Sequence, residues 1–182
     1  SPVPPGSALL LQYREDLGRR PASELSLRIL IAAVGRLRDA PEAALTADYI
    51  QRAAASGRQI GFKAVELIEV ESKPPGDMRA EASSLYRATP DDARRILLDE
   101  RGAEWTSRQL AERLARWRDD GQACTTFWIG GADGTSQSIK DNADEKLAFG
   151  RQTWPHKLVR VMLVEQVYRA LTILCGTPYH RD

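Results

Sequence analysis

The sequence predicts an α/β protein, a parallel sheet flanked by helices on both faces. From Leu27 onward, strand-like segments alternate with segments of helical spacing, which is the order of βαβ units. A chain of 182 residues, 42% hydrophobic and 28% charged, suits one globular domain with a single core. We therefore expect one domain over residues 27–182, preceded by a flexible extension at residues 1–26 that begins with the proline-rich run Ser1–Ser7.

The first half of this domain yields five elements. Leu27–Val34 is an almost continuous apolar run, as buried strands of parallel sheets are. Phe62–Val70 alternates like a strand, and Pro74-Pro75-Gly76 breaks the chain after it. In order, we expect a strand at Leu27–Val34, a helix at Pro41–Gly57 capped by its last glycine, a strand at Phe62–Val70, a helix at Asp77–Ala88 and a short strand at Arg95–Asp99.

The second half begins with the clearest helix of the chain. Thr106 and Gln109 stand at the spacing of an N-terminal capping box. Cys124–Ile129 has the β-branched and aromatic residues that buried strands favour. The expected elements are a helix at Thr106–Gly121, a strand at Cys124–Ile129, a helix at Ser136–Lys146, a short strand at Leu147–Phe149 and a helix at Pro155–Cys175 with Pro155 at its first position.

The last predicted helix is apolar on nearly all sides, so it should be buried on more than one side. In so small a domain this pattern indicates a subunit interface. A core helix surrounded by its own domain is the alternative. Glu165 lies on this helix, and we expect it to be the partner of an arginine.

Three loops at the carboxyl ends of predicted strands are candidates for ligand binding, because open α/β sheets bind ligands there. They are Leu97–Gly102, Ile129–Gly134 and Phe149–His156. The second loop has the spacing G-G-x-x-G, and glycine allows close approach of a ligand to backbone. It lacks the dinucleotide fingerprint G-x-G-x-x-G and comes late in the chain, so a tight turn without a ligand is the alternative.

Other kinds of catalytic site find no support. His156 and His180 are the only histidines, and neither has a second histidine or cysteine at ligand spacing, so we expect no metal. The chain has neither a G-x-S-x-G elbow nor a phosphate-binding G-x-x-x-x-G-K-[ST] loop. A cofactor pocket of backbone and apolar groups remains. It suits S-adenosylmethionine, whose sulfonium already activates the methyl group.

Composition also limits compartment and partners. Cys124 and Cys175 are the only cysteines and no apolar run reaches membrane length, so we expect a reduced, cytoplasmic protein without a membrane span. A net charge of +1 excludes tight RNA binding by overall charge. The basic excess lies in residues 151–182, with five basic and two acidic side chains, and a solvated helix face without a partner is the simpler interpretation.

Several motifs, in order and spacing, resemble those of one known family. They are Ala33-Val34-Gly35, Leu98–Gly102, Ile129-Gly130-Gly131, Trp154–Val161, Glu165–Ala170 and Pro178–Arg181. Together they resemble the RlmH (YbeA-type) family of the SPOUT superfamily, which methylates N3 of a pseudouridine in 23S rRNA. The resemblance extends from Leu27 to the C-terminus. Ala132 and Asp133 depart from the proline and glutamate usual after the paired glycines, and Phe149–Gln152 departs from a serine- and leucine-rich loop.

The resemblance implies a SPOUT-type α/β knot, in which the C-terminal half forms a trefoil knot around S-adenosylmethionine. Such knots are rare exceptions that no periodicity predicts. It also implies a homodimer packed through the last helix, with the C-terminal tail of one subunit completing the partner's active site. Carried over by position, the residues that line the cofactor pocket are Leu98, Gly130, Gly131, Phe149, Gly150, Arg151, Gln152, Thr153 and Trp154.

The tail would act on the target nucleotide. N3 of pseudouridine must lose a proton, and His180 is a candidate base because histidine titrates near neutrality. Binding of phosphate or simple packing is an equal alternative for His180. Arg160, Arg169 and Arg181 are candidates for binding phosphate or stabilising an oxyanion, and Tyr179 for stacking on a base.

Two rival functions belong to other classes. A catalytically inactive ribosome- or RNA-binding knot protein would keep this fold without cofactor affinity. A nicotinamide-dependent oxidoreductase would use Gly130–Gly134 for pyrophosphate, but the first strand lacks the glycine fingerprint. Because the net charge is near zero, we expect the substrate to be 23S rRNA within assembled ribosomes.

Overall fold

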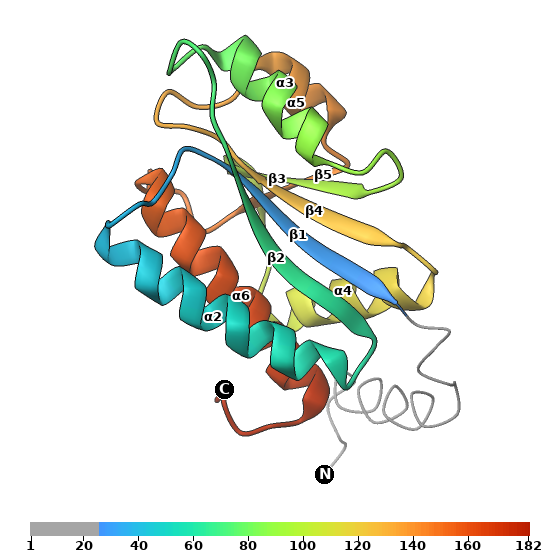
Figure 1. Cartoon of the computed structure of the whole chain (residues 1–182). Coiled ribbons are helices and arrows are strands. Elements are labelled where there is room, and N and C mark those ends of the chain that lie inside the picture. The colour runs from blue at the N-terminus through green and yellow to red at the C-terminus, as the bar shows by residue number, and fades with distance from the viewer. Residues whose placement is uncertain (1–25) are drawn as a thin grey trace.

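Five parallel strands form the sheet at the centre of the fold (Figure 1). The computed structural model describes residues 26–182, so the predicted extension lies outside the described residues except for its last position. The strands stand in the order β2-β1-β4-β3-β5. Their bounds are β1 Leu27–Val34, β2 Phe62–Val70, β3 Arg94–Glu104, β4 Cys124–Ile129 and β5 Glu145–Ala148. The predicted α/β class with a parallel sheet is confirmed.

Helices cover both faces of this sheet, as predicted. They are α2 Pro41–Arg58, α3 Met78–Ala88, α4 Ser107–Asp119, α5 Gln137–Asn142 and α6 His156–Cys175. Figure 1 shows α2, α4 and α6 on one face and α3 and α5 on the other. Within residues 26–182, no helix combines the length and the apolar character needed to cross a membrane.

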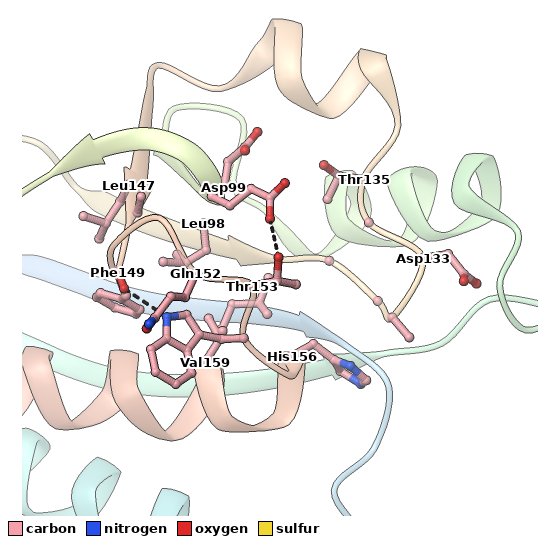
Figure 2. A pocket seen from close by; sticks show the side chains of 18 of the residues that line it. Leu98, Asp99, Asp133, Thr135, Leu147, Phe149, Gln152, Thr153, His156 and Val159 are labelled. Carbon is pink, nitrogen blue, oxygen red and sulfur yellow. Dashed lines mark hydrogen bonds between the residues drawn. The ribbon is translucent and has the colours of Figure 1, made fainter.

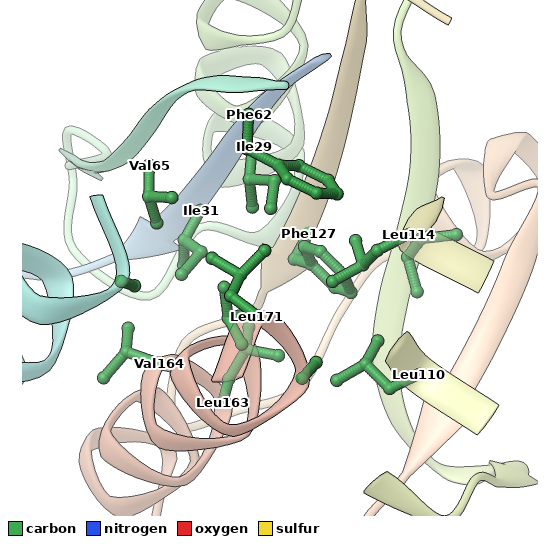
Figure 3. Close-up of a cluster of buried hydrophobic side chains, with 14 of the residues drawn as sticks. Ile29, Ile31, Phe62, Val65, Leu110, Leu114, Phe127, Leu163, Val164 and Leu171 are labelled. Carbon is green, nitrogen blue, oxygen red and sulfur yellow. The ribbon is translucent and has the colours of Figure 1, made fainter. Parts of the chain in front are cut away.

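The main hydrophobic core lies between the sheet and helices α2, α4 and α6 (Figure 3). Successive residues of a strand face opposite sides, so each inner strand contributes to two cores. Ile29 and Ile31 of β1 join Phe127 of β4 in the main core. Ala32 and Trp128, on the same two strands, face the other way and pack against α3 and α5. Every residue of β4 is buried, as its composition predicted.

Several helix ends differ from prediction, and α4 ends at Asp119, two residues before Gly121. α2 continues past Gly57 to Arg58, so this glycine lies inside the last turn and is not the residue that ends the helix. A Cβ on Gly57 would come 2.9 Å from Cβ of Phe62, which leaves room for glycine only. Close packing, not capping, therefore explains this glycine. α5 ends at Asn142 instead of Lys146. α6 begins at His156, with Pro155 as its N-cap residue.

The predicted capping box at the start of α4 is confirmed, since Thr106 and Gln109 exchange both backbone–side-chain hydrogen bonds.

The structure also shows why α6 is apolar on several sides. This helix packs against α2 and α4, and Leu163, Val164 and Leu171 are fully buried by the chain itself. The alternative of a core helix therefore accounts for much of its apolar surface.

The longest departure from prediction is β3, which runs on from Asp99 to Glu104. Leu147 of β5 pairs with both Leu98 and Ala103 of β3, so the pairing is irregular over the residues between them. At Gly102 the backbones of β3 and β5 are in direct contact. A Cβ there would lie 2.6 Å from the carbonyl carbon of Lys146, closer than any side chain can approach.

Gly102→Ala should therefore lower the free energy of unfolding by about 3 kcal/mol, because backbone on both sides has to move. Denaturant unfolding followed by circular dichroism measures this change. The neighbouring exposed Arg101→Ala is the control and should change stability by about 0.5 kcal/mol or less. Equal stability of the two variants would mean that the contact between β3 and β5 yields easily.

Candidate active site

A cavity of about 380 Å³ opens at the carboxyl ends of β3, β4 and β5 (Figure 2). The three loops predicted to bind a ligand all reach it. Asp99 and Glu100 follow the first half of β3, residues 130–135 follow β4, and residues 149–154 follow β5. The start of α6 closes the cavity with His156 and Val159. Segments that are distant in the sequence thus form one ligand-sized site.

Most residues expected to line a cofactor pocket do line this cavity. They are Leu98, Gly130, Gly131, Phe149, Gly150, Gln152, Thr153 and Trp154. Arg151 is the exception, because it is exposed and does not contribute to the lining. Prediction missed His156, although the third loop included it. Burial lowers the pKa of His156, and the cations of Arg160 and Lys157 lower it further, so its imidazole is neutral at pH 7.

Two hydrogen bonds hold the loop before α6 over the cavity. Thr153 donates from Oγ1 to Oε2 of Glu100 (3.0 Å), which ties this loop to the loop after β3. The indole of Trp154 donates from Nε1 to the carbonyl oxygen of Phe149 (3.0 Å), which closes the loop on itself. Gly150 between them has φ +91°, a conformation that favours glycine. The wall of the cavity is therefore fixed before any ligand binds.

The paired glycines are required by packing inside the protein. A Cβ on Gly130 would lie 2.4 Å from Cγ2 of Thr135. A Cβ on Gly131 would lie 3.1 Å from both carboxylate oxygens of Glu81 and 3.3 Å from Val34. A side chain at Gly131 would therefore press on α3.

Glu81 is a buried carboxylate beneath this glycine loop, only 7% exposed. Burial raises its pKa, the nearby charges of Asp133 and Asp77 raise it further, and a hydrogen bond from the backbone of Gly76 opposes the change. Asp133 in turn lines the cavity. The acidic residue that replaces the family's usual glutamate thus stands between the cavity and a second carboxylate.

Arg160 is fully buried, which its predicted role at the target nucleotide did not anticipate. Its guanidinium donates to Oε2 of Glu69 (2.8 Å) and to the carbonyl oxygens of Val34 (3.1 Å) and Gly35 (3.0 Å). Burial lowers the pKa of Arg160, and the Glu69 carboxylate counters that change. A side chain enclosed in this way cannot reach RNA, so Arg160 fastens α6 to the ends of β1 and β2.

The C-terminal tail folds back along α6. Tyr179 donates from its hydroxyl to Oε1 of Glu165 (3.1 Å), and its ring packs against Tyr168 and beneath the guanidinium of Arg169. The same Glu165 carboxylate accepts from Nη2 of Arg169 (2.6 Å), which confirms its predicted role as an arginine partner. His180 contacts Arg169 as well.

The cavity lies at the first turn of α6, whereas the tail docks further along this helix. His156 lines the cavity, and Tyr179 of the tail bonds Glu165 nine residues later, which is about 14 Å along a helix. No residue of Pro178–Asp182 lines the cavity of its own chain. The structure groups the predicted cofactor residues together and the predicted nucleotide-binding residues together, but separately.

A parallel α/β sheet with a preformed cavity at its carboxyl edge defines a ligand-binding α/β protein. A family model described as a predicted SPOUT methyltransferase matches residues 27–180. The chain therefore belongs to the SPOUT methyltransferase family.

Similar proteins carry the name ribosomal RNA large subunit methyltransferase H. That of Paracoccus denitrificans (strain Pd 1222) is 54% identical over 156 residues, which is 86% of this chain and 100% of the relative. That of Hyphomonas neptunium (strain ATCC 15444) is 54% identical over 155 residues, or 85% of this chain and 99% of the relative. That of Phenylobacterium zucineum (strain HLK1) is 53% identical over 156 residues. The resemblance to the RlmH family is confirmed.

Arg160→Ala should lower the free energy of unfolding by about 3 kcal/mol, because it empties a fully buried position, removes the ion pair with part-exposed Glu69 and leaves two backbone carbonyl groups without their donor. Chemical denaturation measures the loss. Arg151→Ala removes an exposed cation beside the same cavity and should cost about 0.5 kcal/mol or less. Unchanged stability of the Arg160 variant, combined with lost activity, would return Arg160 to a direct role in the reaction.

Proposed function

We propose that this protein transfers the methyl group of S-adenosylmethionine to N3 of a pseudouridine in 23S rRNA of the large ribosomal subunit. The observation that carries the proposal is the meeting of three strand-end loops in one cavity of a SPOUT family member. The names of the similar proteins supply the substrate class, and their similarity extends over nearly their whole length.

The cavity has the size and chemistry that S-adenosylmethionine requires. Its volume of about 380 Å³ lies in the range of small-molecule sites. Leu98, Leu147 and Val159 offer apolar contact for an adenine ring. The carboxylates of Asp99 and Glu100 offer acceptors for hydroxyl groups and a negative field for a sulfonium. Bound there, the cofactor would supply an electrophilic methyl group, so the protein's task is to orient donor and acceptor.

A homodimer with shared sites would bring the tail to a cavity. None of Tyr179, His180 and Arg181 lines the cavity of its own chain. We propose that the tail of one subunit reaches the cavity of its partner and acts there on the nucleotide. The apolar side chains of α6 that the chain leaves partly exposed support an interface on this helix, as does the groove beside them. That groove is lined by residues that include Leu45, Trp105, Phe149, Val161 and Met162.

The remaining features of the proposal follow from the family and from charge. The SPOUT family model covers the whole described domain, and we propose the family's trefoil knot in the C-terminal half. With a net charge of +1, the protein lacks the cations to hold free RNA tightly. We therefore propose that the substrate is rRNA in assembled ribosomes and that the protein works in the cytoplasm.

The competing function is a ribosome-binding member of the family without catalysis. The two functions differ in the modification state of the rRNA. In a strain that lacks this gene, mass spectrometry of 23S rRNA should find one methylated pseudouridine missing. Purified protein with S-adenosylmethionine should restore it on isolated ribosomes. Unchanged rRNA in the deletion strain would favour the binding protein over the enzyme.

S-adenosylmethionine should bind in the cavity, and Leu98→Trp should weaken binding at least tenfold, a roughly 1.4 kcal/mol effect of filling the space. Isothermal titration calorimetry measures both affinities. Met78→Trp is the matched control, since it adds the same ring at an exposed position of α3 outside the cavity lining. A nicotinamide cofactor should give no heat. Normal affinity in a folded Leu98→Trp protein would place the cofactor elsewhere.

Deletion of Pro178–Asp182 should abolish methylation while leaving dimerisation and cofactor binding nearly intact. A mixture tests the sharing of sites directly. Dimers formed from tail-deleted and Leu98→Trp subunits contain one intact cavity opposite one intact tail, so random reassociation should recover about a quarter of normal activity. No recovery in mixed dimers verified by native mass spectrometry would mean that each chain serves its own cavity.

A further inference from the structure

A cation from α4 fastens the end of the tail, and the proposed function does not use it. Arg108 lies in the first turn of α4 and donates from Nε to Oδ1 of Asp182 (3.0 Å), with a second bond from Nη2 to Oδ2. Both carboxylate oxygens are thus held, which gives the pair a defined direction. The bonds from Arg108 lower the pKa of Asp182, and His180 lowers it further, so the carboxylate is charged at neutral pH.

The same carboxylate decides which nitrogen of His180 carries the proton. Nε2 of His180 lies 3.1 Å from Oδ1 of Asp182, and Nδ1 lies 3.3 Å from Nη1 of Arg169. A charged carboxylate only accepts and a guanidinium only donates, so Nε2 must donate and Nδ1 must accept. These two partners favour the His180 tautomer that carries hydrogen on Nε2. Both ring nitrogens are engaged, so the docked imidazole has no free lone pair for a substrate proton.

Arg181 stands between these two anchored residues and is left free. Its side chain is exposed and makes no hydrogen bond or ion pair with residues 26–182. A guanidinium never loses its charge near neutrality and binds anionic oxygens through several donors. The tail thus combines two fixed side chains with one exposed cation.

We propose that Arg108 is a positioning residue of the methylation reaction. Its hydrogen bonds to Asp182 hold the end of the tail and, through Asp182, the ring of His180. Arg181 is thereby positioned to bind an anionic oxygen of the target nucleotide in the partner's cavity. There the cation of Arg181 would stabilise the negative charge that develops when N3 loses its proton. The inference rests on the proposed function in one respect, that the tail of one subunit serves the cavity of the other.

Arg108→Gln tests the ion pair between Arg108 and Asp182. Arg116→Gln is its matched control because it removes the same charge from an exposed position of the same helix. Nitrogen-15 NMR of histidine-labelled protein should show His180 protonated at Nε2 in the unaltered protein and in the control, and a mixture of tautomers in Arg108→Gln. With ribosomes as substrate, kcat should fall about fivefold in Arg108→Gln with no change in cofactor affinity. An unchanged His180 spectrum with unchanged kcat would overturn the proposal.

Exchange of the two charges separates docking of the tail from the state of the imidazole. Arg108→Asp combined with Asp182→Arg restores an ion pair but places a donor beside Nε2 of His180. The tail should dock without the Nε2–H tautomer, and kcat should remain low. Full recovery of kcat would overturn the part assigned to His180. If the unaltered protein failed to methylate ribosomes at all, the proposed function would fall, while the NMR spectra would still decide the grip of Arg108.

Discussion

The buried guanidinium of Arg160 is the contact on which the arrangement of the site depends. Its acceptors are the Glu69 carboxylate of β2 and the carbonyl groups at the end of β1, so the first turns of α6 are fixed to the carboxyl edge of the sheet. Glu69 also accepts from the backbone of Leu37 (2.6 Å), which extends the network into the loop after β1. Removing a charge from water is costly, and the three acceptors of Nη1 and Nη2 offset part of that cost, while the buried Nε makes no hydrogen bond. The loop over the cavity immediately precedes the helix so fixed.

Because α6 is fixed at that end, its length separates two chemical regions. Its first turn closes the cavity, and Glu165 and Arg169 further along the helix carry the carboxylate and guanidinium on which the tail docks. One rigid helix holds both regions at a constant spacing, and neither region is complete by itself. A second copy of the chain is the simplest way to unite them, which is why dimerisation and activity are coupled in the proposed function.

The charged residues serve this architecture more than they serve attraction of RNA. Arg94 and Arg113 share Glu145 at the start of β5, while Arg169 is paired with Glu165. Cations engaged in this way contribute little to a positive surface field. Arg181 and Arg151 are exposed and remain available, one on the tail and one beside the cavity. In the proposed function, selectivity for a nucleotide comes from the shape of the substrate and from a few placed cations.

The sequence by itself determined the order of strands and helices, the capping box at Thr106 and the three loops that meet at the cavity, because periodicity and caps are local properties. It did not determine the end of β3 or the beginning of β5, since these depend on pairing around Gly102. Only the tertiary structure determined whether Arg160 is buried or faces a ligand. An arginine on an apolar helix is compatible with either position, and the Glu69 carboxylate that pairs with it lies 91 residues away in the chain. The separation of the tail from the cavity has the same origin, since distance in space depends on how the helix docks.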